Sequence, residues 1–311
     1  MKIKNLIILS CLSVFAFMSC ETTERIDDFP LRPSQLVVNC NFTEGVPFAF
    51  QVSKSLSVLD NADLKLVDSA KVKLFRGDEL IETLTAQNEL GWYVSEISIP
   101  EAGKTYSIEV TSPDFENVLL SEEIAPNKVP ISDVTIQIKD SSFYEWEDHR
   151  DGSIRYGGNI EGSFKIVFSD PAETDNYYTL NAFYMDTIYD NYEDKDDWHL
   201  EKRPLSLSSE DAAIDNDGDN YIILMFRDEF FNGQDYKISA EFYDYQAMRG
   251  KEYFIELTTL GRAGYLYKKS IDDYFLAIND PFAEPVQIFG NIENGYGIFM
   301  GHSISIFPVT F

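Results

Sequence analysis

A two-residue alternation of apolar and polar side chains runs along most of this 311-residue chain, and it restricts the fold to β-strands. Leu36, Val38, Cys40 and Phe42 share one face in this way. The same alternation recurs at 70–74, 106–110, 134–138, 164–168 and 236–242, with turn signals such as Asn232-Gly233 between the runs. We therefore predict an all-β fold, mainly antiparallel sandwiches, in which Cys40 is a buried core residue and not a nucleophile.

Two other patterns predict how the strands are organised. From about Gly261 to Ile278 the apolar residues follow helical spacing, which predicts one amphipathic helix near 261–278. A polar connector with two prolines, Ser121 to Pro130, indicates a domain boundary. We expect an Ig-like or transthyretin-like sandwich over 31–126 and a larger C-terminal β domain over 131–311 that carries the helix. Two acidic stretches, around 144–159 and 186–220, are expected to be long loops.

The N-terminus has the pattern of an export signal. Lys2 and Lys4 precede an uncharged apolar run that stops before Ser19 and Cys20, so residues 1–19 are predicted to be a signal peptide. The run is shorter than the roughly 20 apolar residues of a membrane-spanning helix. The sequence 17–20, Phe-Met-Ser-Cys, resembles the lipobox of bacterial lipoproteins, which predicts cleavage before Cys20 and its acylation. The alternative is an ordinary signal peptide with an incidental cysteine.

Residues 20–30 are polar and acidic, as expected for a flexible tether between the lipid and the folded body. Two or more acyl chains on Cys20 would be enough to hold the protein on a lipid bilayer. The chain carries 25 basic and 53 acidic residues, a net charge of −28. Such a surface repels nucleic acid and anionic headgroups, so no nucleic-acid partner is expected and the lipid must provide the attachment. Cys40 alone remains as a free thiol, so no disulfide framework is expected.

The sequence contains no established catalytic motif. It has no Gly-x-Ser-x-Gly, no His-Glu-x-x-His and no phosphate-binding glycine loop, and His149, His199 and His302 lack metal-ligand spacing. Chance pairs of carboxylates are expected among so many acidic residues, so none identifies a glycosidase. No catalytic residue is predicted, and no cofactor beyond a candidate calcium ion.

The candidate calcium site is the string from Asp215 to Asn220. Asp215, Asp217 and Asp219 occupy the first, third and fifth positions, which resembles the opening of a calcium-binding loop. However, the twelfth position is Phe226 where a bidentate Glu would stand, and the glycine comes at the fourth position instead of the sixth. An acidic β-turn is the alternative.

Aromatic residues are abundant, with 18 Tyr, 23 Phe and 3 Trp. Most are expected in sheets and cores. A subset in the two acidic stretches is a candidate platform on which a sugar or peptide could stack: Phe143, Tyr144, Trp146, Tyr156, Tyr189, Tyr192 and Trp198. Scattered exposed aromatic residues without a function are the alternative.

The C-terminal segment carries a family resemblance. Asn291, Ile292, Glu293, Asn294, Gly295, Tyr296, Gly297, Ile298 and Phe299 form a motif. This motif resembles the closing motif of a Bacteroidota lipoprotein family that is labelled domain of unknown function 4249. Matching stretches include 36–38, 103–106, 168–170 with 176–178, and 226–228 with 231–233. From the residues themselves, the Gly and Asn content predicts a structural turn that feeds a last strand at Ser303 to Phe307. A loop that docks on a partner is the alternative.

The resemblance implies an outer-membrane lipoprotein, exposed at the cell surface and encoded beside a TonB-dependent transporter. A protein of this kind would be an accessory binding subunit for uptake of a nutrient that the sequence does not identify. The resemblance supplies no catalytic residues. A surface adhesin or structural lipoprotein, and a glycan- or peptide-processing hydrolase, are the alternative functions.

Overall fold

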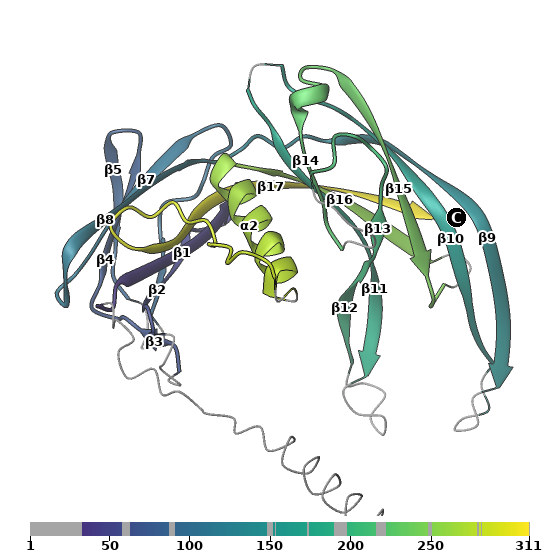
Figure 1. Cartoon of the computed structure of the whole chain (residues 1–311), viewed down its shortest axis with the longest axis horizontal. Helices are drawn as coiled ribbons and strands as arrows, with labels where there is room; N and C mark the ends of the chain where they lie inside the picture. The colour runs from purple at the N-terminus through teal and green to yellow at the C-terminus, as the bar shows by residue number, and fades with distance from the viewer. Residues whose placement is uncertain are drawn as a thin grey trace, which may run out of the picture. The chain divides into compact units, whose positions relative to one another are not determined.

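The computed structural model describes residues 33–57, 63–86, 91–147, 152, 154–172, 174–189, 198–215, 222–247, 251–278, 280 and 282–310 (Figure 1). All elements below belong to one compact unit, Ser34–Leu56 with Asp60–Phe311. The predicted signal peptide 1–19 and tether 20–30, with Cys20, lie outside the described residues. The described fold is mostly β with one α-helix, which confirms the predicted fold class.

The largest sheet has nine strands in the order β12-β11-β16-β17-β1-β2-β3, with β14 paired to β11 and β6 paired to β2. The pairing of β1 with β17 is parallel, and the other pairings in this sheet are antiparallel. The strands are β1 (Leu36–Thr43), β2 (Ala49–Lys54), β3 (Lys65–Leu66), β6 (Trp92–Val94), β11 (Tyr177–Tyr189), β12 (Trp198–Leu205), β14 (Leu224–Arg227), β16 (Glu252–Leu260) and β17 (Tyr296–Thr310).

Two antiparallel four-stranded sheets complete the described β-structure. The first four-stranded sheet has the order β5-β4-β7-β8, with β4 (Lys71–Arg76), β5 (Glu79–Leu84), β7 (Thr105–Ser112) and β8 (Phe115–Ile124). The second four-stranded sheet has the order β13-β15-β10-β9, with β9 (Ile131–Glu147), β10 (Ile154–Ser169), β13 (Leu207–Ser208) and β15 (Asp235–Asp244). The helices are η1 (Asp228–Phe230), of the 3-10 type, and α2 (Arg262–Ile278).

The first core lies between the first four-stranded sheet and strands β1, β2, β6 and β17. Its residues come from the faces that the alternation predicts, and aromatic rings fill its centre. Phe42 contacts Phe299 and Tyr106 at centroid distances of 4.7 and 6.0 Å. Cys40 is buried among them, which confirms its predicted place, and burial raises the pKa of its thiol. A thiol held neutral in this way is a packing group.

The second core lies between the second four-stranded sheet and strands β11, β14 and β16. Phe164 and Ile166 of β10 face Leu180 of β11 and Leu257 of β16 within it, and all four are fully buried. Each core thus has one four-stranded sheet of its own, and both use the nine-stranded sheet as their other layer.

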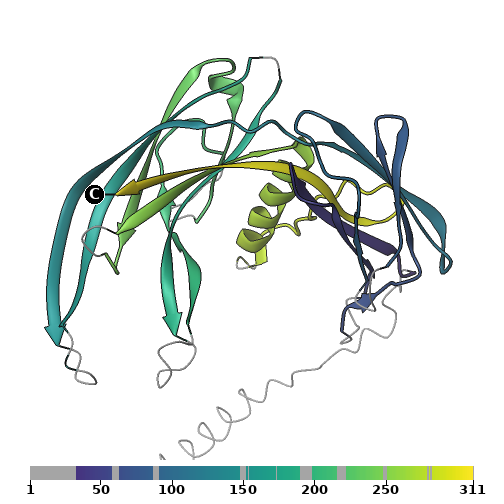
Figure 2. The same ribbon diagram turned by 180° about the vertical axis from the view of Figure 1, so that it is seen from behind.

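Strand β17 joins the two cores. Cys40 of β1 is in register with Phe299 of β17, and Ile255 of β16 is in register with Phe307 further along the same strand. Phe299 belongs to the first core, and Phe307 packs against the second. Figures 1 and 2 show the yellow strand β17 between the purple β1 and the green β16.

The predicted segments 31–126 and 131–311 therefore share one sheet. The connector at 125–130 leads from β8 to β9, so it separates the two four-stranded sheets but not the strands of the nine-stranded sheet. A pairing between segments at opposite ends of a chain leaves no signal in local periodicity, which is why the sequence pattern indicated two separate domains.

Much of the two acidic stretches expected as loops forms strands, although 152 and 209–215 belong to none of the strands. Strands β9 and β10 pair out to Glu147 and Ile154, and β11 and β12 pair out to Tyr189 and Trp198. The loop prediction failed at these strand ends because most of their described side chains are exposed or half-buried, so they lack the apolar alternation that marks a strand with one buried face. The last strand also begins earlier than the predicted Ser303, at Tyr296.

The predicted helix is α2, and strand β8 fixes where it starts. The Glu123 carboxylate of β8 accepts hydrogen bonds from the backbone N–H of Ala263, in the first turn, at 3.0 Å and of Ile124 at 2.9 Å. An acidic group at a helix N-terminus satisfies free N–H donors and the helix dipole. A Cβ at Gly261 would lie 2.5 Å from this carboxylate, so any larger residue there would require the Glu123 side chain to shift. Among the described residues, no helix combines the length and apolar character that a bilayer crossing requires.

Gly297 tests how strictly the β1–β17 pairing constrains the sequence. It has φ +112°, and a Cβ there would lie 2.0 Å from the carbonyl oxygen of Val38 on β1. Gly77 also has positive φ, +58°, but open space around it. We expect Gly77→Ala to cost about 1 kcal/mol from backbone strain, and Gly297→Ala to cost more than about 4 kcal/mol because β1 must move. Urea unfolding measures both, and equal losses would contradict the pairing.

His302 on β17 is expected to make stability depend on pH. Burial lowers its pKa, nearby Lys268 lowers it further, and Nδ1 has no hydrogen-bond partner among the described residues. A histidine with a depressed pKa in the fold contributes stability above its ordinary pKa that is lost as the pH falls. The difference in free energy of unfolding between His302→Gln and the natural protein should therefore shift in favour of the variant as the pH falls from 7.5 to 5. His199→Gln, at an exposed site on β12, is the control. A His302→Gln difference that is constant with pH would contradict this.

Candidate functional site

The strongest candidate site is a cleft of about 680 Å³ in the part of the fold that surrounds the second core. We call it the aromatic cleft. The β9–β10 hairpin, strand β11 and the chain between β15 and β16 supply its walls. Its lining residues are Tyr144, Trp146, Tyr156, Gly157, Tyr184, Met185, Asp186, Tyr245, Gln246 and Lys251. Its volume is in the range typical of small-molecule sites.

One wall of the aromatic cleft is built from ring surfaces. Tyr144 and Trp146 are next-but-one neighbours on β9, and their ring centroids lie 5.7 Å apart. About half of each residue is exposed, 54% for Tyr144 and 47% for Trp146. Gly157 on the paired strand makes room for the rings, because a Cβ there would lie 3.0 Å from the Trp146 ring. The hairpin thus presents two aromatic rings to solvent side by side.

The floor of the aromatic cleft is a buried polar network around Asp244. One oxygen of its carboxylate accepts hydrogen bonds from Lys251 Nζ and from the Tyr253 hydroxyl, both at 2.8 Å. The other oxygen accepts from the Gln246 backbone N–H at 2.9 Å. Lys251 Nζ also donates to the Gln246 carbonyl at 3.0 Å and lies 3.2 Å from the centre of the Tyr184 ring. The Tyr184 hydroxyl donates to Gln246 Oε1 at 2.9 Å, which connects the floor to β11.

Burial dominates the electrostatics of this floor. Burial lowers the pKa of Lys251, and its bond to Asp244 opposes that shift. Burial also raises the pKa of Tyr253, as does the neighbouring Asp244. The other charged side chain of the lining, Asp186, faces Arg203 with 3.8 Å between Oδ2 and Nε. The buried cation Lys251 is therefore compensated by Asp244, whereas Asp186 shares Arg203 with Glu201, which lies closer to it at 2.9 Å, so the edge of the cleft keeps a net negative charge.

The structure brings together three of the seven residues predicted to form a stacking platform, Tyr144, Trp146 and Tyr156. Phe143 instead packs against the second core. Tyr192 and the side chains of Tyr189 and Trp198 lie outside the described residues. Sequence analysis missed Lys251 and its partner Asp244. Their only signal was an acid at the end of β15 and a lysine seven residues later, just before β16, and a charged residue is by default assigned to the surface.

The motif at 291–299 has a structural role. The Asn291 side chain donates to the Phe299 carbonyl at 2.8 Å and accepts from the Phe299 N–H at 2.9 Å, so it holds the start of β17 as a neighbouring strand would. Ile292 is buried in the first core, and Ile298 packs beside α2. Asn294 has φ 62° and donates to the Val118 carbonyl. These contacts favour the structural interpretation of the motif over a docking loop.

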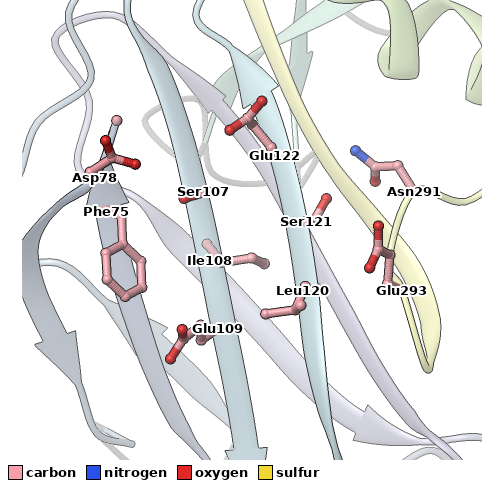
Figure 3. A pocket seen from close by; sticks show the side chains of 11 residues that line it. Phe75, Asp78, Ser107, Ile108, Glu109, Leu120, Ser121, Glu122, Asn291 and Glu293 are labelled. Carbon is pink, nitrogen blue, oxygen red and sulfur yellow. The ribbon is translucent and has the colours of Figure 1, made fainter.

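The motif also borders a second hollow, of about 540 Å³, against β4, β7 and β8 (Figure 3). Phe75, Ile108 and Leu120 provide its apolar surface. The acidic residues around it are Asp78, Glu109, Glu122 and Glu293. Figure 3 shows these carboxylates spread around the hollow without converging on one point. Glu109 is also paired with Lys73 at 2.7 Å, so the hollow does not have the form of a catalytic or metal site.

Four of the other stretches that match the family, 168–170, 176–178, 226–228 and 231–233, meet in one buried polar cluster. The Tyr178 hydroxyl donates to Asp170 at 2.5 Å, and Gly233 N–H donates to the other oxygen of Asp170 at 2.9 Å. Asn176 N–H donates to Asp228 at 2.9 Å, and burial raises the pKa of Asp228. This cluster joins the end of β10 to β11, η1 and the turn before β15, and its partners are internal, so it is architectural.

Of the three candidate calcium ligands, only Asp215 is described. Its carboxylate accepts hydrogen bonds from Arg227 Nε at 2.8 Å and from the Tyr265 hydroxyl, and Lys269 donates to its backbone carbonyl. Asp217 and Asp219 lie outside the described residues. Within the described part of the chain, no group of three or more His, Cys, Asp or Glu is arranged to hold a metal ion. Calcium binding stays a prediction of the sequence.

A family model described as "Domain of unknown function (DUF4249)" covers residues 22–305. No curated protein matches the chain.

The floor of the aromatic cleft is testable through Lys251. Its side chain is 11% exposed and Asp244 is 3% exposed, so Lys251→Met leaves a buried carboxylate unpaired. We expect a loss of about 3 kcal/mol in the free energy of unfolding. Lys202→Met is the matched control, because Lys202 also combines an ion pair, with Glu256, and a ring contact, with Phe183, but is 46% exposed. It should cost less than about 1 kcal/mol. Equal losses in urea unfolding would contradict a buried network.

Proposed function

The chain belongs to the DUF4249 family of domains of unknown function, and from that premise we propose that it is a lipid-anchored binding subunit of a nutrient-uptake system. In this proposal it is a Bacteroidota outer-membrane lipoprotein that faces the cell exterior. It captures a nutrient and passes it to a TonB-dependent transporter in the same membrane. It acts by binding and carries out no chemistry.

The N-terminal sequence supports the anchor. The family match begins at residue 22, two residues after the predicted acylated Cys20. This start is what a lipoprotein family would give, because the conserved domain follows the lipid-bearing cysteine and the signal peptide does not belong to it. The net charge of −28 would oppose binding to anionic headgroups, so a lipid is the attachment that fits the sequence.

The aromatic cleft is the observation that carries the binding role. It combines two exposed rings, Tyr144 and Trp146, with a floor whose polar groups are held in place by Asp244. A concave surface of aromatic and fixed polar groups is the usual composition of a small-molecule site. The buried acid and base of the floor are bonded to each other, which suits a rigid support for a ligand.

A tether would make capture useful to a transporter. A binding module held by a short flexible linker stays at high local concentration near a partner in the same membrane.

An adhesin would use the same anchor, but its deletion should change attachment of the cell and leave growth on every nutrient unaltered. A hydrolase would turn over polysaccharides or peptides.

The proposal is tested by Cys20→Ser in the native host. We expect the variant to be missing from the outer-membrane fraction and to carry no acyl chains by mass spectrometry, because the acceptor thiol is gone. The native protein, extracted in mild detergent, should co-purify with a TonB-dependent barrel.

Cys40→Ala is the control, since it removes the other cysteine of the mature chain and should stay in the outer membrane. An unacylated native N-terminus, or a Cys20→Ser protein that remains in the outer membrane, would contradict the anchor. A native protein that leaves detergent extraction as a solitary monomer would contradict the accessory role.

A further inference from the structure

We infer that the aromatic cleft binds an uncharged saccharide. The inference rests on the proposed capture function and names the class of its ligand. Three properties of the cleft lead to it: the exposed ring surfaces, the pairing of its buried cation with Asp244, and the hydrogen-bonding groups beside the rings.

The rings suit the apolar faces of sugars. A pyranose ring presents axial C–H groups on one face, and these pack against the electron-rich face of Trp or Tyr. Tyr144 and Trp146 are 54% and 47% exposed, with centroids 5.7 Å apart, which is close to the length of one hexose unit. Tyr245, 73% exposed, adds a further ring from the turn after β15. Rings left this exposed without a ligand keep apolar surface in water, which a bound sugar would cover.

The charges of the cleft favour an uncharged ligand. Lys251 is the only cation of the described lining, and its ammonium is already bonded to Asp244 and lies over the Tyr184 ring. A phosphate, carboxylate or acidic sugar would have to break that buried pair to be neutralised. The net charge of −28 also repels anions. An amine would find Asp186, but that carboxylate is 37% exposed to water, which weakens an ion pair there, and it lies 3.8 Å from Arg203, which it shares with Glu201.

The hydroxyl groups of a bound sugar would find hydrogen-bond donors and acceptors around the aromatic rings. Gln246 is exposed at the edge of the cleft and bonded to the Tyr184 hydroxyl, so its amide is held in one orientation. The Asp186 carboxylate lines the same wall. Amide and carboxylate groups beside an aromatic face match the alternating hydroxyls and C–H faces of a sugar. A peptide is the less favoured ligand, because the charged groups of the described lining that would hold its termini are already paired.

The test is titration of the full mature protein with maltohexaose, cellohexaose and mannohexaose by calorimetry. We expect at least one of the three to bind, and Trp146→Ala to weaken it about tenfold or more, since it removes one stacking ring. Trp92→Ala is the matched control, because Trp92 on β6 is 39% exposed and lies outside the cleft lining. Hexagalacturonate, an acidic counterpart of the same length, should bind at least about tenfold more weakly because it brings uncompensated charge.

The inference is overturned if none of the three saccharides binds, if Trp146→Ala and Trp92→Ala weaken binding equally, or if hexagalacturonate or hexa-alanine binds more tightly. Unchanged melting temperatures show that both variants are folded. Co-purification with the transporter is a separate readout. Absent saccharide binding with intact co-purification overturns the ligand class alone, whereas saccharide binding without co-purification overturns the accessory role alone.

Discussion

The parallel pairing of β1 with β17 is the interaction on which the rest of the described structure depends. It places β17 between β1 and β16, so that one strand carries Phe299 into the first core and Phe307 against the second. Asn291 and Gly297 prepare this pairing, the first by imitating a neighbouring strand and the second by leaving room for the Val38 carbonyl. The motif shared with the family is therefore explained by what the start of β17 requires in order to pair with β1.

Local periodicity predicted the strands, helix α2 and the burial of Cys40, because each depends on neighbours within a few residues. It did not predict the nine-stranded sheet, which depends on a pairing between the first and last strands. It also missed the ends of β9 and β10, which are held by backbone hydrogen bonds while most of their described side chains are exposed. The periodicity of apolar residues cannot reveal a strand whose side chains are mostly exposed.

The candidate site also contains residues that the sequence could predict and residues that it could not. Tyr144, Trp146 and Tyr156 could be predicted because aromatic residues in an acidic, polar stretch are conspicuous. The Lys251–Asp244 pair could not, because its burial is created by Tyr184 and Tyr253 from β11 and β16. Charged residues are assigned to water unless the fold encloses them, and only the three-dimensional arrangement shows which ones it encloses. The compensation of the only cation of the described lining, Lys251, by Asp244 therefore comes from the structure alone.

The end-to-end pairing has a consequence for biogenesis. Strand β1 is the first described strand of the chain and its partner β17 is the last, so β1 keeps one unpaired edge until β17 reaches it. An exposed edge of this kind is a template for aggregation. A polypeptide that stops prematurely would lack the closing strand of both sandwiches at once. Quality-control proteases could thus distinguish finished from unfinished copies by the state of a single backbone edge.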